Sequence, residues 1–178
     1  MLPHTETSQI EHYVQAKNSW MAQQVEVEYP TPESLAGRQY YLNAQENIQY
    51  QESLLTDLAK GGWVDEIVEV DFHKLTVLFA QVQAQYWADN EEAERLIIEF
   101  LTQIILDDEY HLVLGFVGGE VAASLIYKIE DDVLLAFDVA LNKKHTNQAR
   151  ETDFIGDFVT HLSSKLLKQN KVIHPKNC

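Results

Sequence analysis

Tyr110–Leu141 reads YHLVLGFVGGEVAASLIYKIEDDVLLAFDVAL, and this stretch decides the fold. Two β-rich runs, Tyr110–Val117 and Glu120–Ile129, are separated by a Gly-Gly pair, which is typical of a β-hairpin. After a short acidic turn, the run Val133–Leu141 is almost wholly apolar, and such a strand is expected to be covered on both faces. The sequence therefore predicts three consecutive antiparallel strands, with the third in the centre of a sheet.

One strand and two helices are expected before this stretch. Trp63–Val70 has a strand-like pattern. Asp71 can cap a helix over residues 72–86, and the acidic run Asp89–Glu92 can cap a second helix that ends near Leu106.

One more helix is expected after it. A polar loop, Asn142–Asp153, precedes an amphipathic helix over residues 154–169, and Lys171–Cys178 leaves room for at most one very short strand. Residues 63–178 are thus expected to form an α+β domain, whose mixed, mostly antiparallel sheet is flanked by helices.

Residues 1–62 are expected to form a mainly helical N-terminal extension. Apolar residues recur every three or four positions over residues 5–24, which predicts a helix. Gln24–Tyr29 alternates apolar and acidic residues and is interpreted as one short, half-buried strand. Thr31-Pro32 can start a further helical segment, which Gly61-Gly62 ends.

Composition excludes several classes of protein. The 178 residues contain 13 Lys and Arg against 28 Asp and Glu, a net charge of -15 that argues against general affinity for nucleic acid or an anionic membrane. No apolar run approaches the ~20 residues that span a bilayer, and the first residues lack the features of a secretory signal, so a cytoplasmic protein is expected. The only cysteine is Cys178, and the seven histidines show no metal-ligand spacing, so no metal site is expected.

The charge is unevenly distributed along the chain. Residues 143–178 hold seven basic and three acidic side chains, a net charge of +4, which leaves -19 for residues 1–142. The loop Asn142–Arg150 is cationic and precedes a helix, and loop amides at a helix N-terminus form a natural phosphate site. Alternatively, a basic C-terminal helix simply offsets an acidic body.

The order of elements and the position of this loop resemble the GCN5-related N-acetyltransferase (GNAT) family, over roughly Glu66–Lys171. LVLGFVGGEVAASLIY resembles the second and third strands of the family. The next strand of the family is followed by Arg or Gln, two residues, Gly, one residue, then Gly or Ala, and Lys144–Ala149 occupies that slot. Ala149 fits the pattern, whereas Asn147 replaces the first glycine and Lys144 replaces Arg or Gln.

The chain departs from the family after the last predicted helix. Members continue with a fifth strand and further elements that form one wall of the acceptor cleft, whereas only Lys171–Cys178 remains here. An N-terminal segment, for example Gln24–Tyr29, is one candidate to supply the missing structure.

The resemblance implies acetyl-CoA as co-substrate and an amine as acetyl acceptor. By this resemblance, the strand edge at Val139, Ala140 and Leu141 would pair with the pantetheine arm. The residues implied to meet the phosphates all lie in the cationic loop: Lys144, Asn147, Gln148, Ala149 and Arg150.

Asp138 is the leading candidate for a catalytic base. A carboxylate inside the apolar run VLLAFDVAL should be partly desolvated, which raises its affinity for a proton. Alternatively, Asp138 faces solvent or pairs with a basic residue.

Two functions from different classes follow. The first is an N-acetyltransferase, or a diverged relative, that acts on an unidentified small-molecule or peptide amine. The second is a non-catalytic, acidic interaction module on a degenerate acetyltransferase-like fold, with the helical N-terminal third as its docking element. A dimer is compatible with both.

Overall fold

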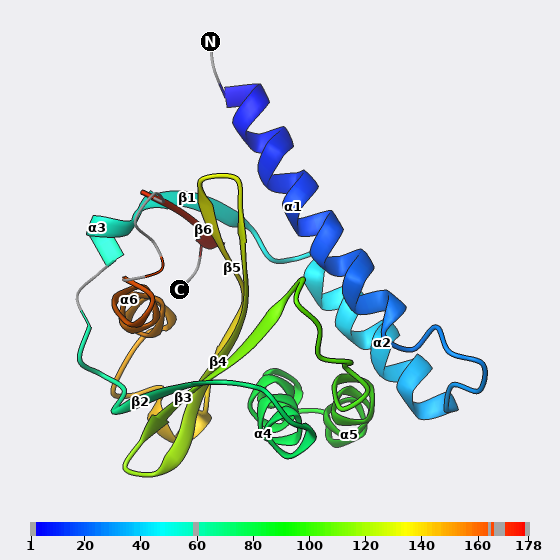
Figure 1. Cartoon of the computed structure of the whole chain (residues 1–178). Helices are drawn as coiled ribbons and strands as arrows, with labels where there is room; N and C mark the ends of the chain where they lie inside the picture. Colours follow the sequence, from blue (N-terminus) through cyan, green and yellow to red (C-terminus); the bar gives the residue numbers. More distant parts are fainter. Residues whose placement is uncertain (1–2, 59–60, 164, 166–169, 177–178) are drawn as a thin grey trace.

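The computed structural model describes residues 3–58, 61–163, 165 and 170–176 of the chain. Within this part, the strands form one six-stranded sheet with the order β1-β6-β5-β4-β3-β2 (Figure 1). Neighbouring strands are antiparallel, except that β5 and β6 are parallel. The strands are β1 (Tyr50–Leu54), β2 (Glu66–Glu69), β3 (His111–Val117), β4 (Glu120–Glu130), β5 (Val133–Leu141) and β6 (Lys171–Pro175).

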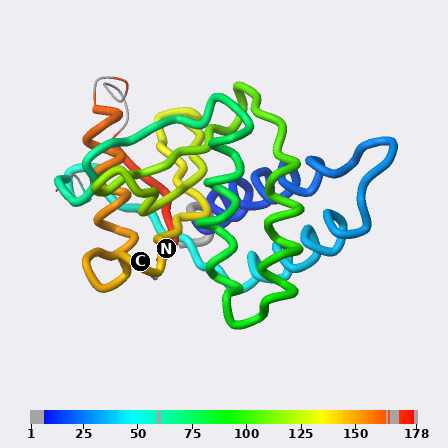
Figure 2. Tube along the Cα trace, turned by 90° about the horizontal axis from the view of Figure 1, so that it is seen from below, coloured from blue at the N-terminus to red at the C-terminus, as the bar shows by residue number. Residues whose placement is uncertain are grey.

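Helices cover both faces of the sheet. They are α1 (Pro3–Gln23), α2 (Pro32–Gln45), α3 (Leu55–Leu58), α4 (His73–Ala84), α5 (Glu91–Leu101) and α6 (Glu151–His161), with short 3-10 helices η1 (Gln85–Trp87) and η2 (Lys143–His145). Figure 2 shows α6, in orange, and the N-terminal helices, in blue, on opposite sides of the strands. The predicted α+β class is confirmed, and so is the predicted order from β2 to α6: a strand, two helices, three strands and a helix.

Alternation along the strands creates the two cores. In β5, Leu135 and Phe137 pack with the core under α1, α2, α4 and α5, while Leu134 and Ala136 pack with the core under α6. Because successive side chains of a strand point to opposite faces, a strand that is apolar at every position is buried on both sides. This confirms the central position predicted for Val133–Leu141.

Local capping and turn residues determine several element boundaries. Thr31 Oγ1 accepts a hydrogen bond from the Ser34 amide (3.2 Å), and Asn90 Oδ1 accepts one from the Ala93 amide (3.1 Å), as expected of N-caps. Gly118 and Gly119 have φ angles of 59° and 79°, which the tight hairpin turn requires. In contrast, α4 is capped by Phe72 rather than Asp71, without a side-chain hydrogen bond.

Two predicted helices have different bounds in the structure. The first ends at Leu101 rather than near Leu106, where turns follow. The second, α6, begins at Glu151 instead of 154 and ends at His161; part of its predicted C-terminal half, at residues 164 and 166–169, lies outside the described residues. Among the described residues, none of the helices is both long enough and apolar enough to cross a membrane.

The N-terminal third does supply a strand, but from another segment than the one expected. Gln24–Tyr29 forms turns and bends, with Tyr29 84% exposed, and none of the strands of the described residues pairs with it. Instead, β1 pairs antiparallel with β6, from Tyr50 opposite Pro175 to Leu54 opposite Lys171. The expected helical extension therefore shares the sheet of the C-terminal part.

Candidate functional site

β5 extends beyond the residues that pair with β6. The two strands pair at three positions, from Val133 opposite Lys171 to Leu135 opposite Ile173. β5 continues to Leu141 with β4 on its other side, and no strand of the described chain pairs with residues 136–141 on the β6 side. The backbone of Val139, Ala140 and Leu141 therefore has a strand neighbour on one side.

A β-bulge lies in the half of β5 that pairs with β4 but not with β6. Ile126 is opposite Phe137, whereas Ser124 is opposite Ala140, so Asp138 and Val139 together face a single residue of β4. Asp138 has a φ of 51°, a left-handed conformation that Asp tolerates better than most residues. From α4, the Gln83 side-chain amide donates hydrogen bonds to the Asp138 carbonyl and to Ser124 Oγ. These contacts fix the bulge.

The Asp138 side chain belongs to a buried polar cluster, which we call the Lys17 network: Lys17, Tyr41, Gln45 and Asp138. Lys17 Nζ lies 2.7 Å from Asp138 Oδ1, 2.7 Å from the Tyr41 hydroxyl and 2.9 Å from Gln45 Oε1. The Tyr41 hydroxyl donates in turn to Asp138 Oδ2. Lys17 is 0% exposed and Asp138 is 7% exposed, so the network ties α1 and α2 to the bulge out of contact with solvent.

Burial dominates the electrostatics of this network. It lowers the pKa of Lys17, against the attraction of the Asp138 carboxylate, which favours the charged ammonium. Burial and the same carboxylate both raise the pKa of Tyr41 well above its ordinary value of 10.0. Asp138 thus has the basic partner that one sequence interpretation allowed, and both of its carboxylate oxygens accept hydrogen bonds from the protein.

Sequence reasoning missed the partner of Asp138. Lys17 lies among the apolar residues that recur along the first helix, between Val14 and Met21. A lysine at a core position of an amphipathic helix requires a buried acceptor, because an unpaired ammonium is too costly to desolvate. The core position of Lys17 in the first helix was therefore the sequence signal that could have identified it as a partner of a buried carboxylate.

The cationic loop after β5 uses part of its backbone internally. Asn142 Oδ1 accepts from the Lys144 amide (3.1 Å), and Gln85 Oε1 accepts from the Lys143 amide (2.7 Å). The Arg150 amide donates to Asp153 Oδ2 (2.7 Å) at the start of α6. The side chains of Lys144 and Arg150 are 72% and 77% exposed, so the loop offers charged side chains together with an incomplete set of amides.

A pocket of about 550 Å³ lies between α3 and the start of α6. Gln148, Ala149 and Arg150 line it, whereas the other residues expected to contact the cofactor, namely Lys144, Asn147, Val139, Ala140 and Leu141, do not. Three carboxylates share the lining, so the pocket is of mixed charge. The remaining residues of the lining are Asp57, Leu58, Gly61, Gly62, Trp63, Thr152, Asp153 and Asp157.

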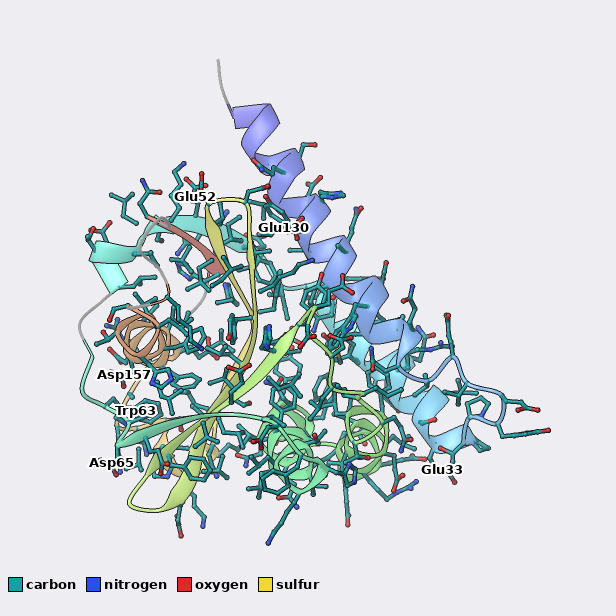
Figure 3. The ribbon with its side chains drawn as sticks, in the orientation of Figure 1. Glu33, Glu52, Trp63, Asp65, Glu130 and Asp157 are labelled. Carbon is teal, nitrogen blue, oxygen red and sulfur yellow. The ribbon has the colours of Figure 1, made fainter. Side chains whose placement is uncertain are left out.

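Asp157 holds one wall of this pocket in place. Its Oδ2 accepts hydrogen bonds from the amides of Trp63 (3.0 Å) and Val64 (2.8 Å), and Figure 3 shows Trp63 and Asp157 close together beside α6. Three buried polar atoms near this corner, Trp63 Nε1, His145 Nε2 and Asp157 Oδ1, have no hydrogen-bond partner among the described residues. Buried polar groups are nearly always satisfied by protein or ordered water, so a water or a ligand at this corner would complete their hydrogen bonding. Within the same residues, no cluster of three His, Cys, Asp or Glu could hold a metal ion.

Neither a protein-family model nor a curated protein matches this sequence. Among solved structures, the chain is similar to a GCN5-related N-acetyltransferase from Kribbella flavida, with 12% identity, a TM-score of 0.48, and coverage of 76% of this chain and 52% of that one. It is also similar to a functionally unknown conserved protein from Staphylococcus epidermidis ATCC 12228, with 9% identity, a TM-score of 0.51, and coverage of 85% of this chain and 60% of that one. The chain thus spans between half and three fifths of these structures, and at such identities the Staphylococcus likeness supports a common fold alone.

Proposed function

We propose that this chain binds acetyl-CoA and transfers its acetyl group to an amine. The divergence of β5 from β6 beside Val139–Leu141 carries the proposal. A strand edge without a neighbour can pair with the amides of a pantetheine arm, as a sheet edge does with an extended peptide. Such pairing fixes the thioester and so removes much of the entropic cost of the reaction.

The pocket between α3 and α6 supports binding of the diphosphate end. Its volume of about 550 Å³ lies within the range of small-molecule and cofactor sites. Arg150 lines it at the N-terminus of an 11-residue helix, and Lys144 projects from the same loop. Because the Lys143 and Arg150 amides are already engaged, exposed side chains carry much of the recognition, and we expect affinity to fall steeply with added salt.

The chemistry requires the Lys17 network to open if Asp138 is the base. Acetyl transfer forms a C–N bond and breaks the C–S bond, while the amine loses a proton and CoA leaves as its thiol. In the closed network both Asp138 oxygens are engaged by Lys17 and Tyr41, and Asp138 then acts by holding the bulge. Opening of α1 and α2 would release the carboxylate to the substrate.

Thermal unfolding with acetyl-CoA or CoA tests the binding step. A ligand at 100 times its dissociation constant stabilises the native state by about 2.7 kcal/mol, which raises the melting temperature measurably. The double variant Lys144→Glu/Arg150→Glu should remove this shift. Lys74→Glu/Arg95→Glu, which changes net charge equally at exposed positions of α4 and α5, should keep it. An unchanged melting temperature at millimolar CoA would contradict the proposal.

The second candidate is a non-catalytic interaction module, and the Lys17 network favours it, because two helices seal the only carboxylate assigned to the chemistry. Thiol release from acetyl-CoA, with spermidine or a lysine-containing peptide as acceptor, separates the two candidates. Turnover supports the transferase. A CoA-dependent shift without turnover for either acceptor class favours a binding protein.

A further inference from the structure

A groove of about 790 Å³ runs between α1 and β1, away from the pocket at α6. Figure 3 labels Glu52 on β1. Its lining alternates between apolar and polar side chains of the two elements. The lining includes Ile10, Glu11 and Val14 of α1, Tyr50 and Glu52 of β1, and Lys176.

The groove follows the open edge of the sheet. β1 is the terminal strand, and five consecutive residues, 48–52, line the groove, so it tracks the backbone rather than one face of the strand. The Lys176 amide donates to the Gln49 carbonyl (2.7 Å), and the Leu55 amide donates to the Asn170 carbonyl (3.0 Å). Odd-numbered residues of β1 therefore bond to β6, and the N–H and C=O groups of Glu52 point toward the open edge.

The helix wall matches the strand wall in length. Residues 7, 10, 11, 14 and 15 form one stripe of α1, about 12 Å long at about 1.5 Å per residue. Residues 48–52, which lead into β1 and form its first half, span about 13 Å at the ~3.3 Å per residue of extended chain. A groove of this shape accommodates roughly four or five residues of extended chain.

We propose that the groove between α1 and β1 binds a basic, extended peptide segment, which adds a seventh strand to the sheet beside β1. Backbone pairing with Glu52 gives the register, and apolar side chains of the peptide pack on Ile10 and Val14. The acidic N-terminal segment that supplies most of the lining favours a basic peptide. Within the groove, Glu11 and Glu52 lie with Lys176, and Glu52 pairs with Lys171 (2.7 Å). Residues 1–58 contain eight acidic and two basic side chains, and one of the two, Lys17, is buried.

Fluorescence anisotropy with the labelled peptide Lys-Val-Lys-Val-Lys tests this site. Glu52→Pro removes an N–H that faces the open edge and leaves the ladder to β6 intact, since proline is tolerated on an edge strand at such a position. Glu52→Ala is the matched control, because it loses the Lys171 ion pair but keeps the N–H. We expect Glu52→Pro to bind at least tenfold more weakly than Glu52→Ala, with unfolding midpoints within a few degrees of each other.

Further arms separate strand addition from general attraction to an acidic protein. The peptide Glu-Val-Glu-Val-Glu, and an N-methylated form of the basic peptide, should each bind at least tenfold more weakly. Glu11→Lys should weaken binding, whereas Glu28→Lys, at an exposed position in the loop after α1, should not. Equal affinities for Glu52→Pro and Glu52→Ala would overturn the proposal. So would a dimer in sedimentation that Glu52→Pro dissociates, since the groove would then hold a second copy of the chain.

Discussion

Two lysines near the second half of β5, Lys17 and Lys144, have opposite surroundings. Lys17 is 0% exposed and meets three oxygen acceptors within 2.9 Å, on the face covered by α1 and α2. Lys144, in the loop toward α6, is 72% exposed and lies 3.9 Å from its nearest acidic partner, Glu120. A desolvated charge is committed to the fold, whereas a solvated one remains available to a ligand. Substitutions at the two places should therefore separate stability from binding.

Lys17→Met should have the largest effect on stability. The substitution keeps the length of the side chain but leaves the Asp138 carboxylate buried without its charge partner, which typically costs about 3–5 kcal/mol. Urea unfolding measures the loss. The double variant Lys17→Met/Asp138→Asn should recover part of it, because Asn carries no charge and also tolerates the positive φ at this position. A loss below about 1 kcal/mol in the single variant would show that the pair is not desolvated in solution.

Tyr41→Phe should cost less, about 1.5–3 kcal/mol, because it removes hydrogen bonds to charged groups and keeps the ring. It should also change the response to alkali. Since the pKa of Tyr41 is raised, the native state retains this proton above pH 10 while the unfolded chain releases it, so stability falls as the pH rises through that range. The free energy of unfolding of Tyr41→Phe should fall less steeply with rising pH than that of the wild type. The stability of the variant should still fall with rising pH, because the pKa values of three other tyrosines, Tyr13, Tyr110 and Tyr127, are also raised.

Alkaline unfolding of the variant and the wild type at matched pH measures this difference. Lys17 acts with the opposite sign below its ordinary pKa, because its lowered pKa makes the native state release a proton that the unfolded chain keeps. Lys17 remains in Tyr41→Phe, so its contribution largely cancels in the comparison. Identical slopes would mean that Tyr41 ionises in the folded protein, and titration of tyrosine absorbance would then detect it near pH 10.

The sequence predicted the half of the sheet that is encoded locally. β3, β4 and β5 follow from a glycine turn and from strand patterns within one continuous stretch, and the bounds of β5 agree with the prediction. β1 was missed because YQESL is weakly apolar and pairs with β6, some 120 residues later in the chain. Its identity as a strand comes from that pairing rather than from its own pattern.

The same distinction applies to the candidate site. The position of Asp138 in a central strand was predicted, but its partners come from α1 and α2, about 100 residues or more away in sequence. The cationic character of the loop was also predicted. The sequence could not show which amides of the loop face outward, because Gln85 and Asp153 accept hydrogen bonds from two of them only in the folded chain.

Lys144→Glu/Arg150→Glu should have the smallest effect on stability, within about 0.5 kcal/mol in urea unfolding, because exposed charges with loose partners contribute little. A glutamate at position 150 also suits the positive end of the α6 dipole. If this variant lost more than about 1.5 kcal/mol, the loop would serve the fold as Lys17 does. Unchanged stability of this variant together with a lost CoA response would assign Lys144 and Arg150 to the ligand. A large loss of stability in Lys17→Met would assign Lys17 to architecture. Basic side chains would then have opposite consequences according to their exposure.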